Sequence, residues 1–191
     1  MKEAIESAFE ESIRVKRAFL RDNLVTLVRV IDAVAAAFQR GNKLLIFGNG
    51  GSAADAQHIA AEFTNRFLID RPPLAALALT TDTSALTSIA NDYDFSHVFA
   101  KQIKALGREG DIALAISTSG KSANILAALD TCRELGITSV GLTGGDGGRM
   151  ASHVEFLLKA SEGKSSPRIQ ETHILVGHVI CEMVDQKLFT S

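Results

Sequence analysis

Two residue types that can carry acid–base chemistry stand four positions apart in the segment GSAADAQHIAAEF, at His58 and Glu62. On a helix that starts near Ser52, both side chains lie on one face, with Asp55 one turn nearer the start. A carboxylate and an imidazole in this arrangement could move a proton on a carbon beside a carbonyl group, or bind a metal ion. A pair with this spacing is often only a solvated hydrogen bond, so its surroundings in the sequence decide its meaning.

Two loops rich in small polar residues could hold a substrate near this pair. They are GNGGSA at residues 48–53, directly before the pair, and STSGKSA at residues 117–123. Glycine lets the backbone approach a ligand, hydroxyl groups donate hydrogen bonds, and the free N–H groups of a helix start attract anions. Two such loops predict a phosphate or phosphosugar site, although Ser52 and Ser122 could instead be helix N-caps.

Neither loop matches a nucleotide-binding motif in full. Gly48, Gly50 and Ala53 fit the dinucleotide pattern GxGxxA, but the acidic residue expected about 20 positions later is missing, since the first candidate is Asp82. AISTSGKS resembles a P-loop but has Ala115 at the position of the leading glycine. Its run of hydroxyl groups therefore favours a monophosphate over a triphosphate with magnesium.

These loops must be positioned by an alternation of strands and helices. Continuous apolar runs, typical of strands covered on both faces, lie at residues 43–47, 74–79, 111–117, 139–143 and 154–160. Segments with helical spacing lie between them, at residues 52–68, 83–91, 95–106 and 122–135. The sequence predicts the α/β class: a flavodoxin-like three-layer sandwich with a five-stranded, mostly parallel sheet, preceded by N-terminal helices. Ligands of such sheets bind beyond the carboxyl ends of the strands, where both polar loops lie.

Both ends of the chain are predicted to be helical. Residues 1–41 have helical patterning that stops at Gly41, and they carry more apolar positions than a surface decoration needs, so we expect an oligomerisation segment. Pro167 suits the first turn of a final helix that runs to about Leu188. No repeat or linker divides the sequence, and we expect a single domain over residues 1–191.

Composition excludes several other classes of function. The formal net charge of −2 and the pI near 6.2 provide no basic surface for nucleic acid, so an anionic ligand must be held by local groups. The charged N-terminus does not resemble a signal peptide, and no apolar run is long enough to cross a bilayer. We therefore expect no membrane contact and a cytoplasmic location. Cys132 and Cys181 lie far apart within apolar helical patterns, which indicates buried free thiols.

Five motifs follow one another along the chain: GNGGSAADAQHIAAEF, IANDY, STSGKS, LTGGDGG and RIQETHILVGH. Together they resemble the sugar isomerase (SIS) family over nearly the whole chain, and within it the bacterial phosphoheptose isomerases. The resemblance implies an enzyme that converts sedoheptulose 7-phosphate to glycero-manno-heptose 7-phosphate through an enediol, the first step of nucleotide-activated heptose biosynthesis. It also implies a homotetramer whose active sites are shared between subunits.

The resemblance further assigns roles to individual residues. Glu62 and His178 form the acid/base pair, and one Zn²⁺ per subunit is bound by His58, Glu62, Gln170 and His178. The substrate is bound by Asn49, Gly50, Gly51, Ser52, Glu62, Asn91, Asp92, Ser117, Thr118, Ser119, Ser122 and Gln170. Spacing alone does not select His178, which stands among apolar residues and could instead be a core histidine. The LTGGDGG motif is assigned no chemistry and is expected to be a tight strand-to-helix turn.

Two alternatives have no catalytic role. Some bacterial proteins with the SIS fold are tetramers that bind the replication initiator, but such binders lack the carboxylate and the final histidine that Glu62 and His178 supply here. A SIS module that senses a phosphosugar in a regulator is also compatible with the fold, although no DNA-binding segment is attached to this sequence. The presence of both chemical side chains favours the enzyme.

Overall fold

Five short parallel strands form one sheet at the centre of the computed structural model, which describes residues 1–190. The strands lie in the order β2-β1-β3-β4-β5, and their bounds are β1 Leu44–Gly48, β2 Ala76–Ala78, β3 Ile112–Ser117, β4 Thr138–Gly144 and β5 Phe156–Ala160. This is the flavodoxin-like strand order, and every pairing is parallel. The predicted α/β sandwich is confirmed.

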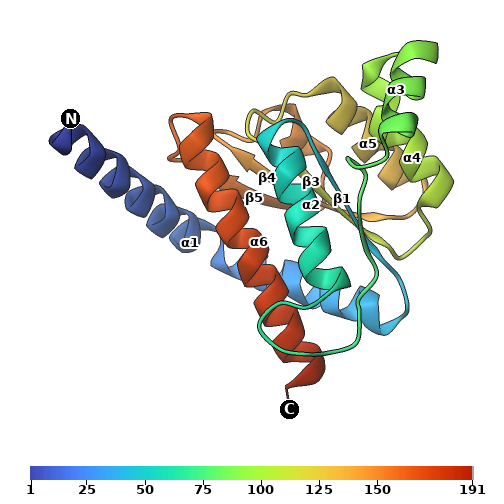
Figure 1. Cartoon of the computed structure of the whole chain (residues 1–191), viewed down its shortest axis with the longest axis horizontal. Coiled ribbons are helices and arrows are strands. Elements are labelled where there is room, and N and C mark those ends of the chain that lie inside the picture. The colour runs from blue at the N-terminus through green and yellow to red at the C-terminus, as the bar shows by residue number, and fades with distance from the viewer. Residues whose placement is uncertain (191) are drawn as a thin grey trace.

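Helices cover both faces of the sheet (Figure 1). One face is covered by α1 (Lys2–Gln39), α2 (Gly51–Thr64) and α6 (Ser166–Phe189). The other is covered by α3 (Thr83–Asp92), α4 (Val98–Leu106) and α5 (Ala123–Glu134), with short 3-10 turns η1 (Phe95–His97) and η2 (Gly148–Ser152). None of the helices in residues 1–190 combines the length and the apolarity that a membrane span requires.

The continuous apolar strands supply two separate cores, because alternate residues of a strand point to opposite faces. In β1, Leu44 and Ile46 pack with α1, α2 and α6, whereas Leu45 and Phe47 pack with α4 and α5. This explains why the strand sequences do not alternate between apolar and polar residues.

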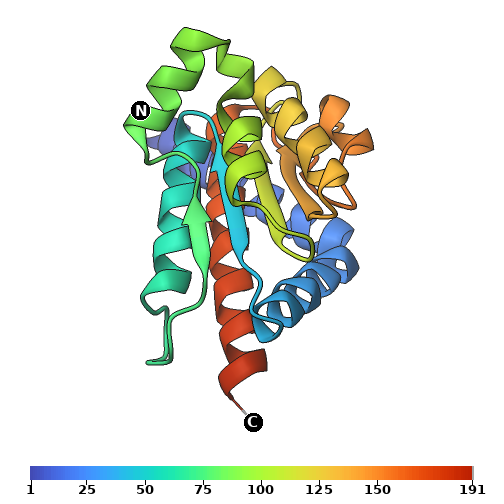
Figure 2. The same ribbon diagram turned by 90° about the vertical axis from the view of Figure 1, so that its right-hand side faces the viewer.

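Helix α1 is one continuous helix of 38 residues, whereas the sequence predicted N-terminal helices in the plural. Its first part projects beyond the sheet (Figure 1), and its buried residues begin at Val15. The helix packs against α6 and β5. The helix ends before Gly41, whose φ of +78° is the left-handed conformation that glycine adopts most readily. Helix α6 begins with Pro167 in its first turn, as predicted, and extends beyond the sheet towards the C-terminus (Figure 2).

Two elements are shorter than the sequence predicts. Strand β2 covers three residues of the apolar run 74–79, and α2 ends at Thr64 rather than near residue 68. The helix stops because Asn65 leaves the helical conformation and Arg71, further along the chain, donates hydrogen bonds to the carbonyl groups of Glu62 and Phe63. This arginine supplies donors that another helical turn would otherwise have supplied.

The order of the strands brings the two polar loops together. The chain leaves β1 towards β2 at one edge and returns to β3 on the other side of β1, so β1 and β3 are neighbours. The loops that follow them lead into α2 and α5 at the same end of the sheet. This is the switch point at which open parallel sheets bind ligands.

Candidate active site

A cavity of about 100 Å³ lies at the carboxyl ends of β1 and β3. We call it the serine cavity, and it is lined by Asn49, Ser52, Ile116, Ser117, Thr118, Ser119, Ser122 and Gln170. All of these except Ile116 are residues that the sequence analysis selected for substrate binding. The structure thus brings both polar loops and the start of α6 to one small polar space.

Ser52 and Ser122, which could have been helix N-caps, do not cap their helices with their side chains. Ser52 lies inside the first turn of α2, and Gly50 occupies the N-cap position. Ser122 does occupy the N-cap position of α5, but its side chain makes no capping hydrogen bond to the described part of the chain. Its hydroxyl group lies 3.4 Å from that of Ser117 instead. Both hydroxyl groups are therefore placed to contact a ligand.

Hydrogen bonds between side chains hold the two loops against each other. Asn49 in the first loop and Asn124 in α5 exchange two hydrogen bonds of 2.9 and 2.8 Å through their side-chain amides. In the second loop, the amide N–H of Gly120 donates to Ser117 Oγ at 3.2 Å. The donors of the serine cavity are therefore fixed before any anion arrives.

A glycine turn after β4 supports the second loop from behind. A Cβ atom on Gly120 would lie 2.0 Å from the carbonyl oxygen of Gly147, and one on Gly148 would lie 2.5 Å from that of Ser119. The LTGGDGG motif is therefore a tight turn, as predicted, and its glycines allow close backbone contact with the serine loop.

On α2 and α6, which also contribute Ser52 and Gln170 to the serine cavity, His58, Glu62 and His178 form what we call the histidine–glutamate cluster. Glu62 Oε1 lies 3.0 Å from His58 Nε2 and 3.4 Å from His178 Nε2, and the two Nε2 atoms are 3.1 Å apart. The side chain of Glu62 is 14% exposed, whereas those of His58 and His178 are 53% and 36% exposed. Helices α2 and α6 therefore bring together groups that are 116 or more residues apart in the chain, and His178 is not a core histidine.

The cluster fits a divalent metal ion. One ligand atom from each of the three side chains lies within 4.8 Å of the other two, and two imidazole nitrogens with a carboxylate oxygen are a donor set that zinc accepts. Glu62 Oε2 is buried and has no hydrogen-bond partner among residues 1–190, so the carboxylate has bonding capacity left. The cluster is therefore a possible metal-binding triad.

The remaining predicted residues lie around these two centres. Gln170 lines the serine cavity, where its side chain covers Gly51, and within residues 1–190 no hydrogen bond joins it to the cluster. Gly50 lines an adjoining hollow with Gly48 and Thr80. Asn91 and Asp92 lie at the end of α3, where they are exposed and hydrogen-bonded to each other at 2.9 Å. In this chain alone, the structure does not bring that pair into the serine cavity.

Two further side chains that the sequence did not assign a role lie close to the cluster. Phe67 stacks on the ring of His178, with 5.7 Å between centroids. Burial raises the pKa of Asp55, while the nearby His58 and His178 oppose the rise, and Asp55 Oδ2 is buried without a partner in the described residues. Helical spacing had already placed Asp55 one turn before His58, without assigning it a role, but no spacing rule indicates Phe67.

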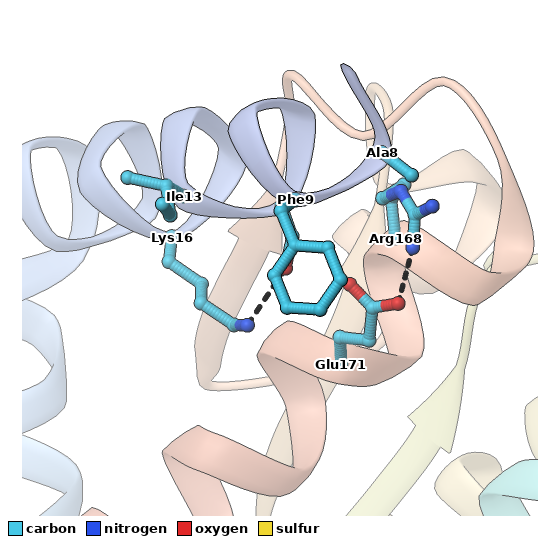
Figure 3. Close-up of a pocket in the computed structure, with 7 residues that line it drawn as sticks. Ala8, Phe9, Ile13, Lys16, Arg168 and Glu171 are labelled. Atoms are coloured by element: carbon cyan, nitrogen blue, oxygen red, sulfur yellow. Dashed lines mark hydrogen bonds and ion pairs between the residues drawn. The ribbon is translucent and has the colours of Figure 1, made fainter. Parts of the chain in front are cut away.

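A separate hollow of about 280 Å³ lies between α1 and α6 (Figure 3). It is lined by Ala8, Phe9, Ser12, Ile13, Lys16, Arg168 and Glu171, and the drawn ion pair joins Arg168 to Glu171. None of its lining residues belongs to the serine cavity or to the cluster. Its apolar members Phe9 and Ile13 are exposed, which is a property of a surface that another protein chain could cover.

Comparisons with known proteins identify the family of this chain. The SIS domain profile matches residues 9–144. The phosphoheptose isomerase of Aneurinibacillus thermoaerophilus is 52% identical over 193 aligned residues, which cover 99% of this chain and 96% of the relative. The phosphoheptose isomerase of Thermodesulfovibrio yellowstonii is 49% identical, with coverage of 99% and 94%.

Solved structures give the same result. A phosphoheptose isomerase from Neisseria gonorrhoeae superposes with a TM-score of 0.90 at 44% identity, covering 97% of this chain and 98% of the other. One from Francisella tularensis has a TM-score of 0.92 at 38% identity, with coverage of 96% and 97%.

Proposed function

Since this chain belongs to the SIS-domain family, and within it to the phosphoheptose isomerases, we propose that the serine cavity and the histidine–glutamate cluster together form its active site. The chain is an aldose–ketose isomerase, and its reaction is the interconversion of sedoheptulose 7-phosphate and glycero-manno-heptose 7-phosphate. The observation that best supports the location of the chemistry is the contact of one carboxylate, Glu62, with two imidazoles on the two helices that also line a polar cavity.

The serine cavity would bind the phosphate group. Hydroxyl groups of Ser52, Ser117, Thr118, Ser119 and Ser122 supply donors, and the start of α5 adds free N–H groups and its dipole. His58 lies six residues after Ser52 on α2, which is about 9 Å along the helix. A sugar chain anchored by its phosphate would therefore extend along α2 towards the cluster, and Asn49, Gly50, Gly51 and Gln170 would contact it on the way.

The cluster would then transfer the protons. Glu62 removes a proton from the carbon beside the carbonyl group and returns it to the neighbouring carbon, while His178 moves the proton between the two oxygens of the enediol. The shared contacts between the three side chains support this division, because a base must be held within hydrogen-bond reach of the group that it serves. Asn91 and Asp92 are proposed to bind sugar hydroxyl groups, for which their exposed position leaves them available.

We propose zinc as the metal, with His58, Glu62 and His178 as ligands and Gln170 as a fourth. A bound zinc ion would polarise the carbonyl and hydroxyl oxygens of the sugar. Removing the metal with a strong chelator should abolish activity, and readdition should restore it. Full activity in protein shown by elemental analysis to be free of metal would contradict this part of the proposal.

A shared-site homotetramer is proposed for the assembly. Apolar side chains lie exposed along α1, with Phe9 67% and Val25 76% exposed, and the hollow in Figure 3 opens beside Phe9.

The phosphorylated substrate supports a cytoplasmic location, because a charged sugar phosphate crosses a bilayer only at great cost in free energy.

The proposed isomerase and the alternative, a non-catalytic protein that binds the replication initiator, predict different results in one assay. If the chain is the isomerase, purified protein should convert sedoheptulose 7-phosphate to a product of the same mass with a different retention time. In D₂O, the product should carry one carbon-bound deuterium if the proton reaches solvent from Glu62. Protein that is folded, loaded with zinc and inert towards sedoheptulose 7-phosphate would contradict the proposed function.

A further inference from the structure

The buried residue Arg71 connects the two helices that carry the histidine–glutamate cluster. Its side chain is 1% exposed, and its Nε donates a hydrogen bond of 2.9 Å to Asp185 Oδ1, on a side chain that is 3% exposed. Asp185 follows His178 by seven residues, which is two turns of α6 on nearly the same face. Arg71 thus binds α6 on the same helix face that carries His178.

The same guanidinium group holds the end of α2. It donates to the carbonyl groups of Phe63 at 2.6 Å, Glu62 at 2.9 Å and Asn65 at 3.2 Å. These carbonyl groups, at the end of a helix, have no partner within the helix. The carbonyl of Glu62 belongs to the residue whose carboxylate contacts both histidines, so Arg71 acts directly on the backbone that carries the cluster.

Close packing between the helices fixes their lateral spacing at the same level. A Cβ atom on Gly177, the neighbour of His178, would lie 2.5 Å from Ile59 Cδ1 on α2. This contact determines how closely the helices approach but does not prevent them from sliding along each other, because apolar contacts are not directional. The directional bonds of Arg71 to both helices supply that restraint.

We propose that Arg71 and Asp185 are positioning residues that fix the axial register of α2 against α6 and thereby hold Glu62 in reach of His178. The inference rests on the proposed function, since it assigns the pair a part in that reaction. A buried ion pair is by itself weak evidence for a role in stability, because apolar residues of similar volume often serve as well. Small displacements of acid–base groups, in contrast, reduce turnover strongly.

The test uses variants that retain much of the buried structure. Arg71→Lys keeps the positive charge but cannot bond to Asp185 and all three carbonyl groups at the end of α2 in the same geometry, and Asp185→Asn keeps the shape of the acceptor. The matched control is Asp111→Asn. It weakens another ion pair that involves a buried carboxylate, in which Lys43 Nζ lies 2.6 Å from Asp111 Oδ2, at the amino end of β1 and β3 and away from the proposed site.

Four quantities are measured for each protein: kcat, KM, the melting temperature, and the visible absorption spectrum of the cobalt(II)-loaded protein. We expect the two positioning variants, Arg71→Lys and Asp185→Asn, to lose about 10- to 100-fold in kcat with little change in KM, and to show a shifted cobalt spectrum. Asp111→Asn should lower the melting temperature while keeping the kcat and the spectrum of the parent.

The proposal is overturned if the two positioning variants are destabilised like Asp111→Asn yet keep the parent kcat and cobalt spectrum. If Arg71→Lys does not fold, Asp185→Glu, which keeps the charge but displaces it by one methylene group, is judged by the same two outcomes. A parent protein that binds cobalt but does not isomerise the sugar would defeat the proposed function alone, since the spectra of the variants would still report the geometry of the cluster.

Discussion

His173 shows how a single side chain on α6 can have a structural role next to a site made of chemically similar residues. It is completely buried, and its Nε2 lies 3.1 Å from the carbonyl oxygen of Thr143 on β4. Burial lowers the pKa of His173 to about 4, although the hydrogen bond to Thr143 opposes the shift. His178, five residues later, is partly exposed and contacts Glu62. Position on the helix, rather than residue type, separates the two.

The depressed pKa of His173 predicts how stability depends on pH. In the unfolded chain this histidine has its ordinary pKa of about 6.5, whereas in the folded chain it binds a proton only near pH 4. Between these two pH values the unfolded state binds more protons, so the free energy of unfolding falls as the pH drops. The loss between pH 7 and pH 5 should be about 2 kcal/mol for this group. Urea unfolding at both pH values would measure it. In His173→Gln this part of the pH dependence should vanish, and an unchanged dependence would show that other groups cause it.

Single residues were predictable from sequence only where their contacts are local. His58 and Glu62 are one helical turn apart, and their pairing follows from the period of the helix. His178 and Gln170 were selected only through resemblance to a family, because contacts across more than 100 residues leave no periodic signal. Arg71 gave no signal at all, since its partners are backbone carbonyls and an aspartate on α6.

At the scale of elements, the serine loop depends on the glycine turn behind it. Gly120 has a φ of +61° and no room for a Cβ atom beside the carbonyl of Gly147. Gly120→Ala should therefore displace the hydroxyl groups of Ser119 and Ser122 and raise KM by about tenfold or more, as expected when hydrogen bonds worth about 1 to 3 kcal/mol are lost. Steady-state kinetics with the sugar phosphate would measure this change.

Gly145→Ala is the matched control for this prediction. Gly145 also has a positive φ, of +54°, but a Cβ atom there would meet nothing within 4 Å. The variant carries similar backbone strain without pushing on the serine loop. Equal KM values for the two variants would indicate that strain, and not the contact between the loops, sets the affinity for substrate.

The elements themselves were well predicted because strands and helices differ clearly in this sequence. Each predicted strand and helix is present, and the errors lie at their ends. The run 95–106 is divided into η1 and α4, and Asp94 caps η1 by accepting a hydrogen bond from the amide of Ser96. The early end of α2 depends on Arg71, a tertiary contact that helical propensity does not contain.

At the scale of the whole molecule, α1 extends further than one subunit requires. Leu20, Leu24, Val25 and Val28 are each about half exposed or more on a helix that already packs its other side against α6 and β5. Isolated exposed apolar residues are ordinary, but a row of them along one helix marks a surface that binds another chain. A second copy of this chain is the proposed partner.

This leads to a prediction for assembly. The double variant Leu24→Glu and Val25→Glu should shift the protein from the proposed tetramer to smaller species in sedimentation velocity, because two charges would be buried without partners. If sites are shared between subunits, activity should fall together with the mass. Glu3→Gln, near the free start of the same helix, should change neither. A parent protein that is already monomeric would contradict the proposed assembly.

Prediction of the assembly from sequence requires contacts between chains. Patterning of residues 1–41 predicted a helix, and the helix is present, but a helical pattern does not specify what its outer face binds. The contacts that shape such an interface belong to two chains and leave no spacing rule in one sequence. The roles of Asn91 and Asp92, exposed on α3, depend on the same information.

The most direct test of the proposed chemistry is proton exchange at the reacting carbon by Glu62→Gln. Incubation of sedoheptulose 7-phosphate in D₂O with saturating zinc would be followed by NMR for the parent and the variant. We expect the variant to fold and assemble like the parent but to exchange the carbon-bound proton about 100- to 10,000-fold more slowly. Exchange by Glu62→Gln at the parent rate would show that another group is the base and that the histidine–glutamate cluster is not the centre of the reaction.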